Sequence, residues 1–421
     1  MTRSDIATPP SCDTLGHDMI DANTALQRLL DAAQPVTETE RVSILDALGR
    51  TLAEDVISTI DVPGHDNSAM DGYALRSEDV AEPGTRLTVT QRIAAGSTGD
   101  TVLPGTAARI FTGAPIPPGA DAVVMQESCE VDGDSVIIRQ QVTPGLNIRP
   151  QGNDLRKGET AIAAGTRIGP AQMSLAAGVG VNEVPVRRRL RAAILYTGDE
   201  IIEPGRPLGE GQIYNSNRYA LRGLLQSLGL EVTVDRHVED DFEATREAFL
   251  DASKKADVII SSGGVSVGGE DHVKPAIEAE GRLDMWKIAM KPGKPLAFGA
   301  IGNATVFGLP GNPVSVFITF LLFVRPYLLK TQGCSDYLPR PLPVRAGFDW
   351  PRPGIRREFA RARITVDAQQ RIEAILFPRQ GSDVSSSVAW ADGVVIIPEN
   401  ETVKKGDVVE YLAFAELMSA F

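Results

Sequence analysis

Glycine-rich loops follow apolar runs in the second half of this chain. One loop, at 261–271, comes after an apolar run at 257–260, and another, at 309–315, comes after 305–307 and opens a long apolar helix. Glycines at a strand end let backbone N–H groups turn toward a bound anion, and the start of a helix adds partial positive charge. In open α/β sheets such loops gather at the carboxyl edge, where ligands bind. The pattern therefore predicts a site for a phosphorylated ligand.

Two further segments belong to the same predicted edge. A Thr-Gly pair follows the first predicted strand of the sheet, and a rigid Lys-Pro-Gly-Lys-Pro loop occupies 291–295. The candidate ligand-binding residues are Thr197, Gly198, Ser262, Gly263, Gly264, Ser266, Gly268, Lys294, Pro310, Gly311, Asn312 and Ser315.

Acidic residues lie just beyond three strands of this sheet. Glu200 follows the first strand, Asp240 the second, and Asp271 the glycine-rich loop after the third. Because the strand ends share one edge, the carboxylates can converge on Mg²⁺, which prefers oxygen ligands. Each acid has a second interpretation, since an acid here also caps a following helix, as the pair Asp240-Asp241 would for a helix beginning at residue 242.

Lysines provide the opposite charge. Lys287 and Lys291 are four residues apart, so an extended chain would place both side chains on one face, and Lys294 follows in the rigid loop. Converging ammonium groups repel one another unless an anion lies between them. The alternative is an ordinary solvated strand edge.

A second dense motif lies far from these loops, at residues 66–74. Within it Asp71 precedes Gly72, which we expect to allow an unusual turn and to point the acid into a cleft. A similar turn holds Thr112. By composition alone both segments are also ordinary turns of a β domain.

Composition restricts the class of protein. The 421 residues carry a net charge of −13, and the pI is about 5.0, which argues against nucleic acid or an anionic membrane as partner. The three cysteines, Cys12, Cys129 and Cys334, are scattered and predict neither disulfides nor a zinc site. The polar N-terminal residues lack a signal-peptide pattern, and the apolar run at 314–324 is shorter than a membrane span. We therefore expect a cytoplasmic protein with this run as a buried helix.

The first half of the chain predicts a discontinuous domain with an insertion. Residues 1–18 read as a loose tail. Helical patterns at 19–33, 38–48 and 170–178 predict a helical linker domain formed by 19–60 and 145–186. Between these parts, 61–144 is rich in Gly and Pro with short strand-like pieces such as 86–93, 107–111 and 122–126, which predicts an inserted β-rich domain.

The second half changes character near residue 187. Apolar strands alternate with helices up to residue 332, which predicts a mostly parallel sheet with helices on both faces, ending in a helix at 313–329. From 333 to 421 the short strands and turns are typical of a small β-barrel. The predicted fold class is multidomain α/β plus β.

The order of the motifs resembles one protein family closely. The chain is similar to the molybdopterin molybdenumtransferases, which act in molybdenum cofactor synthesis and are related to the C-terminal part of gephyrin. The matching segments between about residues 60 and 315 are DNSAMDGYA, RIFTGAPIPPGAD, RPQGND, TGDE, GQIYNSN, ISSGGVSVG, MKPGKP and GLPGNPVS. The resemblance implies a helical linker domain, an inserted β domain, a Rossmann-like molybdopterin-binding α/β domain and a C-terminal β-barrel, in an elongated homodimer.

The resemblance also implies a reaction. Adenylylated molybdopterin and molybdate give molybdenum cofactor and AMP with Mg²⁺. A molybdopterin adenylyltransferase and molybdoenzyme apoproteins are candidate partners. The family's functional positions fall on Asp71, Thr112, Glu200, Asp240, Asp271, Lys287 and Lys291. His272 departs from the family pattern, since related enzymes often carry an aromatic there, and this weakens any stacking role but leaves the acid at 271.

The residues suggest how such a site would work, and two alternatives stay open. Acids beside anionic substrates repel them unless a cation intervenes, so we expect Mg²⁺ to bridge Glu200, Asp240 and Asp271 to the phosphates. Lys287 and Lys291 would then neutralise molybdate or the leaving phosphate. One alternative is a molybdopterin adenylyltransferase that uses ATP, and the other is a gephyrin-like scaffold without enzymatic activity.

Overall fold

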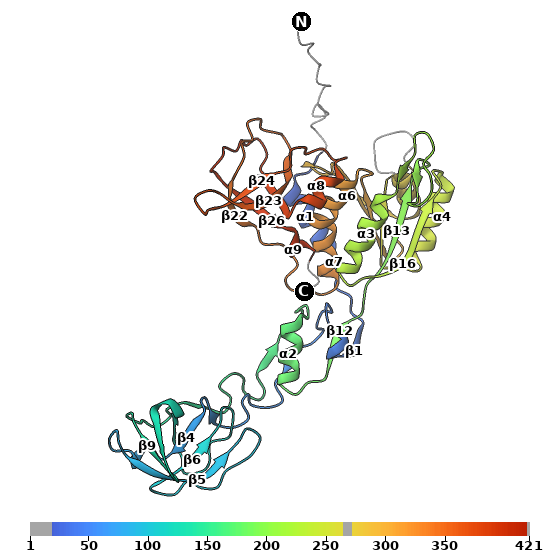
Figure 1. The fold of residues 1–421 in the computed structure, drawn as a ribbon. Coiled ribbons are helices and arrows are strands. Elements are labelled where there is room, and N and C mark those ends of the chain that lie inside the picture. Colours follow the sequence, from blue (N-terminus) through green and yellow to red (C-terminus); the bar gives the residue numbers. More distant parts are fainter. Residues whose placement is uncertain (1–18, 264–271, 419–421) are drawn as a thin grey trace.

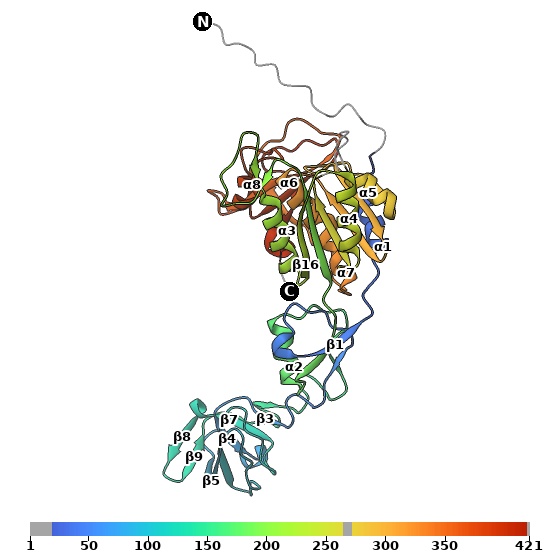
Figure 2. The same cartoon turned by 90° about the vertical axis from the view of Figure 1, so that its right-hand side faces the viewer.

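The computed structural model describes residues 19–263 and 272–418 of the chain. Figure 1 shows a body, made of an α/β domain and a β-barrel, from which an arm leads down to a separate β domain. The view in Figure 2, turned by 90°, shows the same three parts in a row. We call the separate β domain, which corresponds to the predicted insertion, the distal domain.

The body is built on a mixed sheet of order β16-β13-β17-β21-β20-β18. The first four strands are parallel to one another, as predicted, and the last two pairings, β21 with β20 and β20 with β18, are antiparallel. The four parallel neighbours are β13 (Arg191–Thr197), β16 (Glu231–Val238), β17 (Val258–Ser262) and β21 (Ala304–Leu309), followed by β20 (Pro295–Ile301) and β18 (Arg282–Lys287). All four parallel strands end at the same edge of the sheet.

Helices cover both faces of this sheet, as predicted. On one face α3 (Ser216–Ser227) and α6 (Pro313–Thr319) bury Leu221, Phe307 and Phe320 with their neighbours. On the other face α4 (Phe242–Ser253) and α5 (Val273–Glu280) enclose a cluster around Phe249 and Ile277. The two clusters form the core that holds the strand ends in place.

The helix that begins with α6 is longer than the apolar run in the sequence indicates. It continues through a π-helical turn (Phe320–Val324) into α7 (Arg325–Thr331). Pro326 lacks the N–H that a regular α-helix would need next, which accounts for the wider turn. At 19 residues the helix is long and apolar enough to cross a bilayer, but 83% of its apolar window is buried within the protein. The prediction of a buried helix is confirmed.

The linker domain contains more strand than predicted. The helix predicted at 38–48 is wrong: β1 (Thr39–Ser43) pairs antiparallel with β12 (Glu183–Arg187), and one 3₁₀ turn follows. The β-branched residues Thr39 and Val42 suit a strand, and pairing with β12 overrides the helical spacing. The remaining elements are β2 (Val56–Ile57), β11 (Thr160–Ile162) and α2 (Pro170–Gly178), the last as predicted.

Helix α1 (Ala22–Ala32) lies outside the linker, although its residues fall in the predicted linker segment. Its buried face, including Ala25 and Leu29, belongs to the same apolar cluster as α7 in the body. The connection from body to linker therefore starts after α1.

Charged pairs tie the linker to the body. Arg188, between β12 and β13, donates to both carboxylate oxygens of Asp257, at 2.7 and 3.1 Å, and Arg191 donates to the same group. Burial alone would raise the pKa of Asp257, but the hydrogen bonds from these arginines outweigh it and lower the pKa to about 2. Asp257 is thus a permanent anion at the joint.

The distal domain is a sheet of order β7-β4-β6-β5-β9-β8 around its own core. The predicted strands at 86–93, 107–111 and 122–126 are confirmed within one residue at each end. The strands are β4 (Gly72–Leu75), β5 (Arg86–Ile93), β6 (Thr106–Ile110), β7 (Ala122–Met125), β8 (Cys129–Asp132) and β9 (Ser135–Ile138). A short pair, β3 (Asn67–Ser68) and β10 (Ile148–Arg149), joins it to the arm.

The C-terminal residues form the predicted barrel, which closes because β23 pairs with both β24 and β25. Its strands are β22 (Leu342–Ala346), β23 (Arg357–Val366), β24 (Ile372–Leu376), β25 (Gly393–Ile397) and β26 (Val408–Ala413). Two short helices, α8 (Ser385–Trp390) and α9 (Phe414–Leu417), lie beside it. A further strand, β19 (Met290–Lys291), leaves the α/β domain to pair with β23.

Gly72 corrects the expectation of an unusual turn. It lies inside β4, which pairs with β6 on one side and β7 on the other, and its φ is not positive. A Cβ at this position would lie 1.9 Å from the carbonyl oxygen of Val124. Glycine is therefore required by the close approach of β7.

We expect Gly72→Ala to destabilise the distal domain by about 1–3 kcal/mol, because the added methyl group must push two paired strands apart. Gly223→Ala is the control: it lies within α3, where an added Cβ meets nothing within 4 Å, and it should stabilise the chain by up to about 1 kcal/mol. Thermal unfolding followed by circular dichroism measures both. Equal melting curves for Gly72→Ala and the unmodified chain would contradict the packing argument.

Candidate active site

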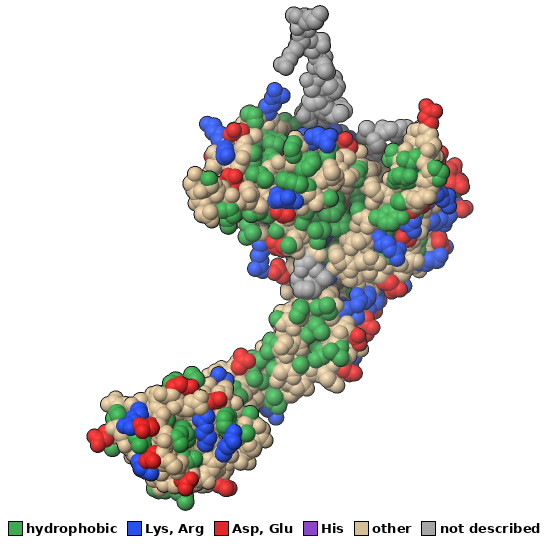
Figure 3. Space-filling model, viewed as in Figure 1, with side chains coloured by type: hydrophobic (Ala, Val, Ile, Leu, Met, Phe, Trp, Pro, Cys, Tyr) green, Lys and Arg blue, Asp and Glu red, His purple; other side chains and the backbone are tan. Residues whose placement is uncertain are grey.

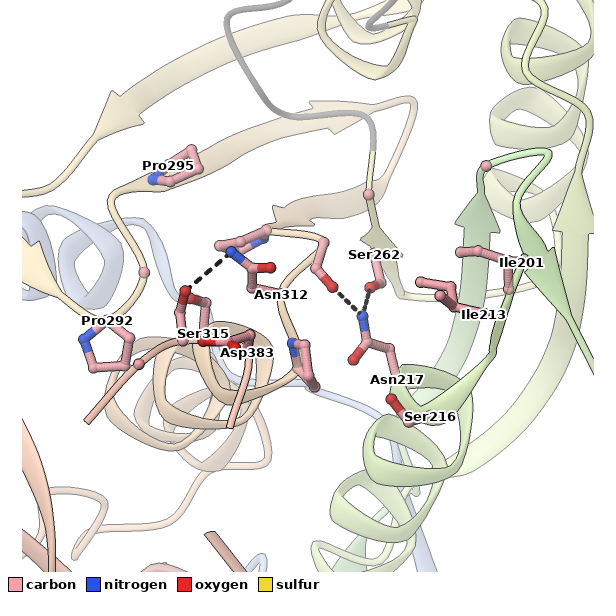
Figure 4. A pocket seen from close by; sticks show the side chains of 18 of the residues that line it. Ile201, Ile213, Ser216, Asn217, Ser262, Pro292, Pro295, Asn312, Ser315 and Asp383 are labelled. Atoms are coloured by element: carbon pink, nitrogen blue, oxygen red, sulfur yellow. Dashed lines mark hydrogen bonds between the residues drawn. The ribbon is translucent and has the colours of Figure 1, made fainter. Parts of the chain in front are cut away.

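A large pocket opens where the carboxyl ends of the parallel strands face the barrel. Its volume is about 1210 Å³. The α/β domain supplies one wall and the barrel the other, with β19 and the loop after it between them. Figure 4 shows how side chains from α3, β17 and the start of α6 meet there. The sheet edge that the glycine-rich loops predicted to bind a ligand therefore carries a pocket in the structure.

Most of the described candidate residues line this one pocket. They are Thr197, Gly198, Glu200, Asp240, Ser262, Gly263, Lys291, Lys294, Pro310, Gly311, Asn312 and Ser315. Residues more than a hundred positions apart in the sequence are thus neighbours at one sheet edge.

Other predicted residues lie elsewhere. Asp71 and Thr112 are in the distal domain, at the far end of the arm from the body (Figure 1). Gly264, Ser266, Gly268 and Asp271 lie outside the described residues.

Lys287 does not belong to the pocket lining, and the reason is the path of the chain. Lys287 pairs with Pro295 in the α/β sheet, whereas Lys291 pairs with Glu358 of the barrel. Between them the backbone contacts Ile20 instead of continuing as one strand. The assumption of one straight extended segment is wrong, and of the two lysines it is Lys291 that lines the pocket.

Acidic side chains from the α/β domain line the pocket. The Glu200 side chain folds back over Gly198. A Cβ added to that glycine would lie only 2.6 Å from a Glu200 carboxylate oxygen, so the position requires glycine. Asp240 also lines the pocket. Its neighbour Asp241 accepts a hydrogen bond at 2.9 Å from the N–H of Ala244 and caps α4. Asp241 therefore takes the capping role, whereas Asp240 lines the pocket and its metal role stays a prediction.

No group of three or more acids, histidines or cysteines is placed to hold a metal ion within the described ranges. The third carboxylate of the predicted cluster, Asp271, is not among those residues. Glu200 and Asp240 are the part of that cluster for which the structure gives positions.

Basic side chains gather at the loop after β19. Lys291 lies 3.2 Å from both carboxylate oxygens of Glu358, whose side chain is only 9% exposed. Lys294 and Arg356 complete this part of the lining. Gly293 allows the loop to pack closely, since its φ is +104° and a Cβ there would lie 2.3 Å from the hydroxyl oxygen of Thr319 in α6. The loop is thereby held between α6 and the barrel.

Acidic and basic side chains occur together both on the surface and in the pocket. On the face seen in Figure 3, basic and acidic side chains are interspersed over both the body and the distal domain. Inside the pocket, Glu200 and Asp240 follow strand ends of the sheet, Lys291 and Lys294 belong to the loop around β19, and Arg356 and Asp383 come from the barrel.

The barrel wall was missed by sequence reasoning. Gln380, Gly381, Ser382 and Asp383 line the pocket from a barrel loop. Asn312 donates to the hydroxyl oxygen of Ser382 at 3.0 Å, which links this loop to the start of α6. No motif marks such residues, because a turn after a barrel strand has no distinctive spacing.

Arg361 explains how that barrel loop is held. Its side chain is fully buried and donates to the carbonyl of Gly381 at 3.0 Å and to the hydroxyl of Ser387 at 3.1 Å. Burial lowers the pKa of Arg361 to about 10. The group is still charged at neutral pH, so these hydrogen bonds are charge-assisted.

Asp71 and Thr112 contact each other in the distal domain. One carboxylate oxygen of Asp71 accepts from the N–H of Thr112 at 2.8 Å and from its hydroxyl at 2.7 Å. These two hydrogen bonds lower the pKa of Asp71. Close by, the ring of Phe111 has Arg92 and Arg109 over it, each 4.8 Å from the ring centre. The distal domain thus presents an ionised acid beside stacked arginines.

Comparison with known proteins covers nearly the whole chain. Residues 20–180 match the model of the MoeA N-terminal region (domain I and II), 193–330 match a probable molybdopterin binding domain, and 343–414 match the MoeA C-terminal region (domain IV).

Individual relatives agree with these matches. The molybdopterin molybdenumtransferase of Haemophilus influenzae is 38% identical over 95% of this chain and 100% of its own. That of a Nostoc species is 41% identical over 73% of this chain and 72% of its own. The crystal structure of the molybdopterin biosynthesis moeA protein from Pyrococcus horikoshii OT3 superposes with a TM-score of 0.80 at 30% identity, covering 94% of this chain and 100% of that one. The chain therefore belongs to the molybdopterin molybdenumtransferase family, and it is an enzyme of that type.

Proposed function

We propose that this enzyme inserts molybdate into adenylylated molybdopterin, giving molybdenum cofactor and releasing AMP, in a reaction that depends on Mg²⁺. The observation that carries the proposal is the pocket at the sheet edge, where three carboxylates, those of Glu200, Asp240 and Asp383, and three basic side chains line a common space. Family membership supplies the substrate class, and the charges in the pocket fit it.

The size and polarity of the pocket suit such substrates. A volume of about 1210 Å³ exceeds the roughly 300–1,000 Å³ of ordinary small-molecule sites. A pterin joined to a nucleotide through two phosphates is a large ligand with several negative charges. Lys291, Lys294 and Arg356 supply positive charge for phosphate or molybdate oxygens, and charge-assisted hydrogen bonds of this kind are the stronger ones.

The acidic residues suit a magnesium ion. Glu200 and Asp240 provide carboxylate oxygens in the pocket wall, and we propose that Asp271 joins them as predicted. Hard oxygen ligands from one or two carboxylates together with substrate phosphates are the usual environment of Mg²⁺. The ion would supply positive charge between these acids and the phosphates of the ligand.

The protein's own residues would then position the substrate and neutralise the charge on its phosphates. Lys291 is oriented by Glu358, and Lys294 extends from the loop that Gly293 seats against α6. Breaking a phosphoanhydride requires alignment and stabilisation of charge on the leaving phosphate, without a covalent intermediate on the enzyme. The dithiolene sulfurs of the substrate hold molybdenum, so no protein thiol is needed, and Cys129 and Cys334 both lie outside the pocket lining.

We further propose that the working enzyme is a homodimer. Asp71 and Thr112 are family functional positions, yet they lie at the end of the arm and not on the pocket wall. A second copy can bring its own distal domain to the pocket of the first, which a single chain does not do. A cytoplasmic location also stays a prediction.

Release of AMP is the measurement that tests the proposed reaction. Purified protein supplied with adenylylated molybdopterin and Mg²⁺ should release AMP only when molybdate is added. Supplying molybdopterin and ATP without molybdate tests the adenylyltransferase alternative, for which adenylylated product would accumulate. Absence of both reactions, together with failure to restore cofactor synthesis in a deletion strain, would favour a scaffold.

We expect Lys291→Ala to lower molybdate-dependent AMP release roughly tenfold or more, because it removes a charge-assisted contact worth about 1.5–3 kcal/mol. Lys255→Ala is the matched control. Lys255 pairs with Asp251 just beyond the end of α4, next to the start of β17 and so at the opposite edge of the sheet. The control should keep full activity. Equal rates for the two variants would remove Lys291 from the mechanism.

We expect Asp240→Asn to need a higher Mg²⁺ concentration for half-maximal activity, and to be slower at saturation, because it removes one anionic oxygen ligand. The control is the adjacent change Asp241→Asn. Asparagine caps helices as well as aspartate does, so this variant should titrate like the unmodified enzyme. A Mg²⁺ titration of Asp240→Asn that overlays that of Asp241→Asn would argue against the metal role.

A further inference from the structure

Asn217 joins two loops of the pocket from a third element. It is the second residue of α3, and its side chain is buried, with 8% exposed. Its amide nitrogen donates to the carbonyl oxygen of Gly311 at 2.6 Å and to the hydroxyl oxygen of Ser262 at 2.9 Å. Figure 4 shows both hydrogen bonds radiating from this one nitrogen, with the amide oxygen on the side away from them.

The contact with Gly311 determines which way the amide faces. A backbone carbonyl oxygen can only accept, so the group 2.6 Å from it must be the NH₂ of Asn217. The second N–H of the same nitrogen then points to Ser262. Both donor hydrogens of Asn217 are therefore committed.

This orientation has a consequence for Ser262. Its oxygen accepts from Asn217, so its own O–H hydrogen has to point to another acceptor. Within the described residues Asn217 is the recorded side-chain partner of this hydroxyl. Ser262 ends β17 and lines the pocket, although only 2% of it is exposed. A phosphate oxygen, which only accepts, is the complementary partner for such a donor.

A second observation sets Asn217 apart from an ordinary structural asparagine. Its amide oxygen is fully buried and has no hydrogen-bond partner among the residues that the structure describes. A residue that served the fold alone would gain from satisfying this acceptor. The unmatched oxygen lies in a side chain at the pocket wall that joins two ligand-facing loops.

We propose that Asn217 is a positioning residue that makes the Ser262 hydroxyl a hydrogen-bond donor to the phosphates of the ligand and holds the Gly311 loop beside it. The inference rests on the proposed function for the identity of the ligand, and it adds a specific phosphate contact. Neither the glycine pattern nor the acids of the pocket required this contact.

The substitution Asn217→Asp tests the direction of these hydrogen bonds. A carboxylate has nearly the same shape but only accepts, so it would draw the Ser262 hydrogen toward itself and away from the ligand. Ser262→Ala removes the hydroxyl and leaves the contact between Asn217 and Gly311. A double-mutant cycle of the two changes cancels the effect of the new charge, which is present in both backgrounds.

The probe is inorganic pyrophosphate, with Kd measured by calorimetry on the full chain in Mg²⁺. We expect Ser262→Ala to weaken binding roughly tenfold, as for a hydrogen bond to a charged group. Asn217→Asp should weaken binding by at least as much in the unmodified chain, and by clearly less when Ser262 is already alanine. Equal factors in both backgrounds, or no binding of pyrophosphate by the unmodified chain, would overturn the proposal.

A second variant covers the case in which Asn217→Asp does not fold. Asn217→Ala removes the donor that directs the Ser262 hydrogen toward the ligand, so it should weaken pyrophosphate binding in the unmodified chain and clearly less when Ser262 is already alanine. A purely structural role predicts the same factor in both backgrounds. The AMP-release assay keeps the two proposals separate. Coupling between positions 217 and 262 without molybdate-dependent release of AMP would refute the proposed reaction alone. Release of AMP without that coupling would refute the role of Asn217 alone.

Discussion

The short pairing of β19 with β23 is the interaction on which the site depends. It carries the chain from the α/β sheet to the barrel and brings Lys291 to the buried carboxylate of Glu358. The barrel also packs on the α/β domain through a shared apolar cluster that includes Phe359 and Phe414, but this pairing is what places the lysine loop at the pocket. The contact of Gly293 with Thr319 holds the same loop from the other side. A few backbone contacts thus decide where the positive charge of the site is held.

The acidic and basic residues of the pocket come from different elements of the fold. Glu200 and Asp240 come from loops after parallel strands, where a carboxylate beside a helix start is electrostatically favourable, as Asp241 on α4 illustrates. The basic residues come from the crossing loop and the barrel. A pocket that contains both acids and bases can hold an anionic ligand together with a cation, whereas a pocket of one sign would repel one of them. The two-domain construction is therefore part of the chemistry.

Local patterns predicted the elements well but not their partners. The strand at 86–93 and the helix at 170–178 have the predicted limits, because their periodicity and boundary residues are local properties. The segment 38–48 failed because its strand depends on a partner about 140 residues away. Lys287 was misplaced for a similar reason, since the chain changes sheets after it. Arg361 and Asn217 carry no local signal, because their importance lies in hydrogen bonds to loops that only the fold brings near.

The arm can place the distal domain only if its orientation relative to the body is fixed. Contacts between the linker and the body serve to fix it. Arg188, which follows β12 of the linker, binds Asp257 of the body, and the buried Thr51 of the linker lies 3.2 Å from the sulfur of Cys334 in the body. Such contacts resist bending at the connection. A stiff arm keeps Asp71 away from the pocket of its own chain, and it also keeps this acid at a constant position relative to the body. In the proposed dimer, that constancy would let a distal domain reach the partner's pocket without an entropic search.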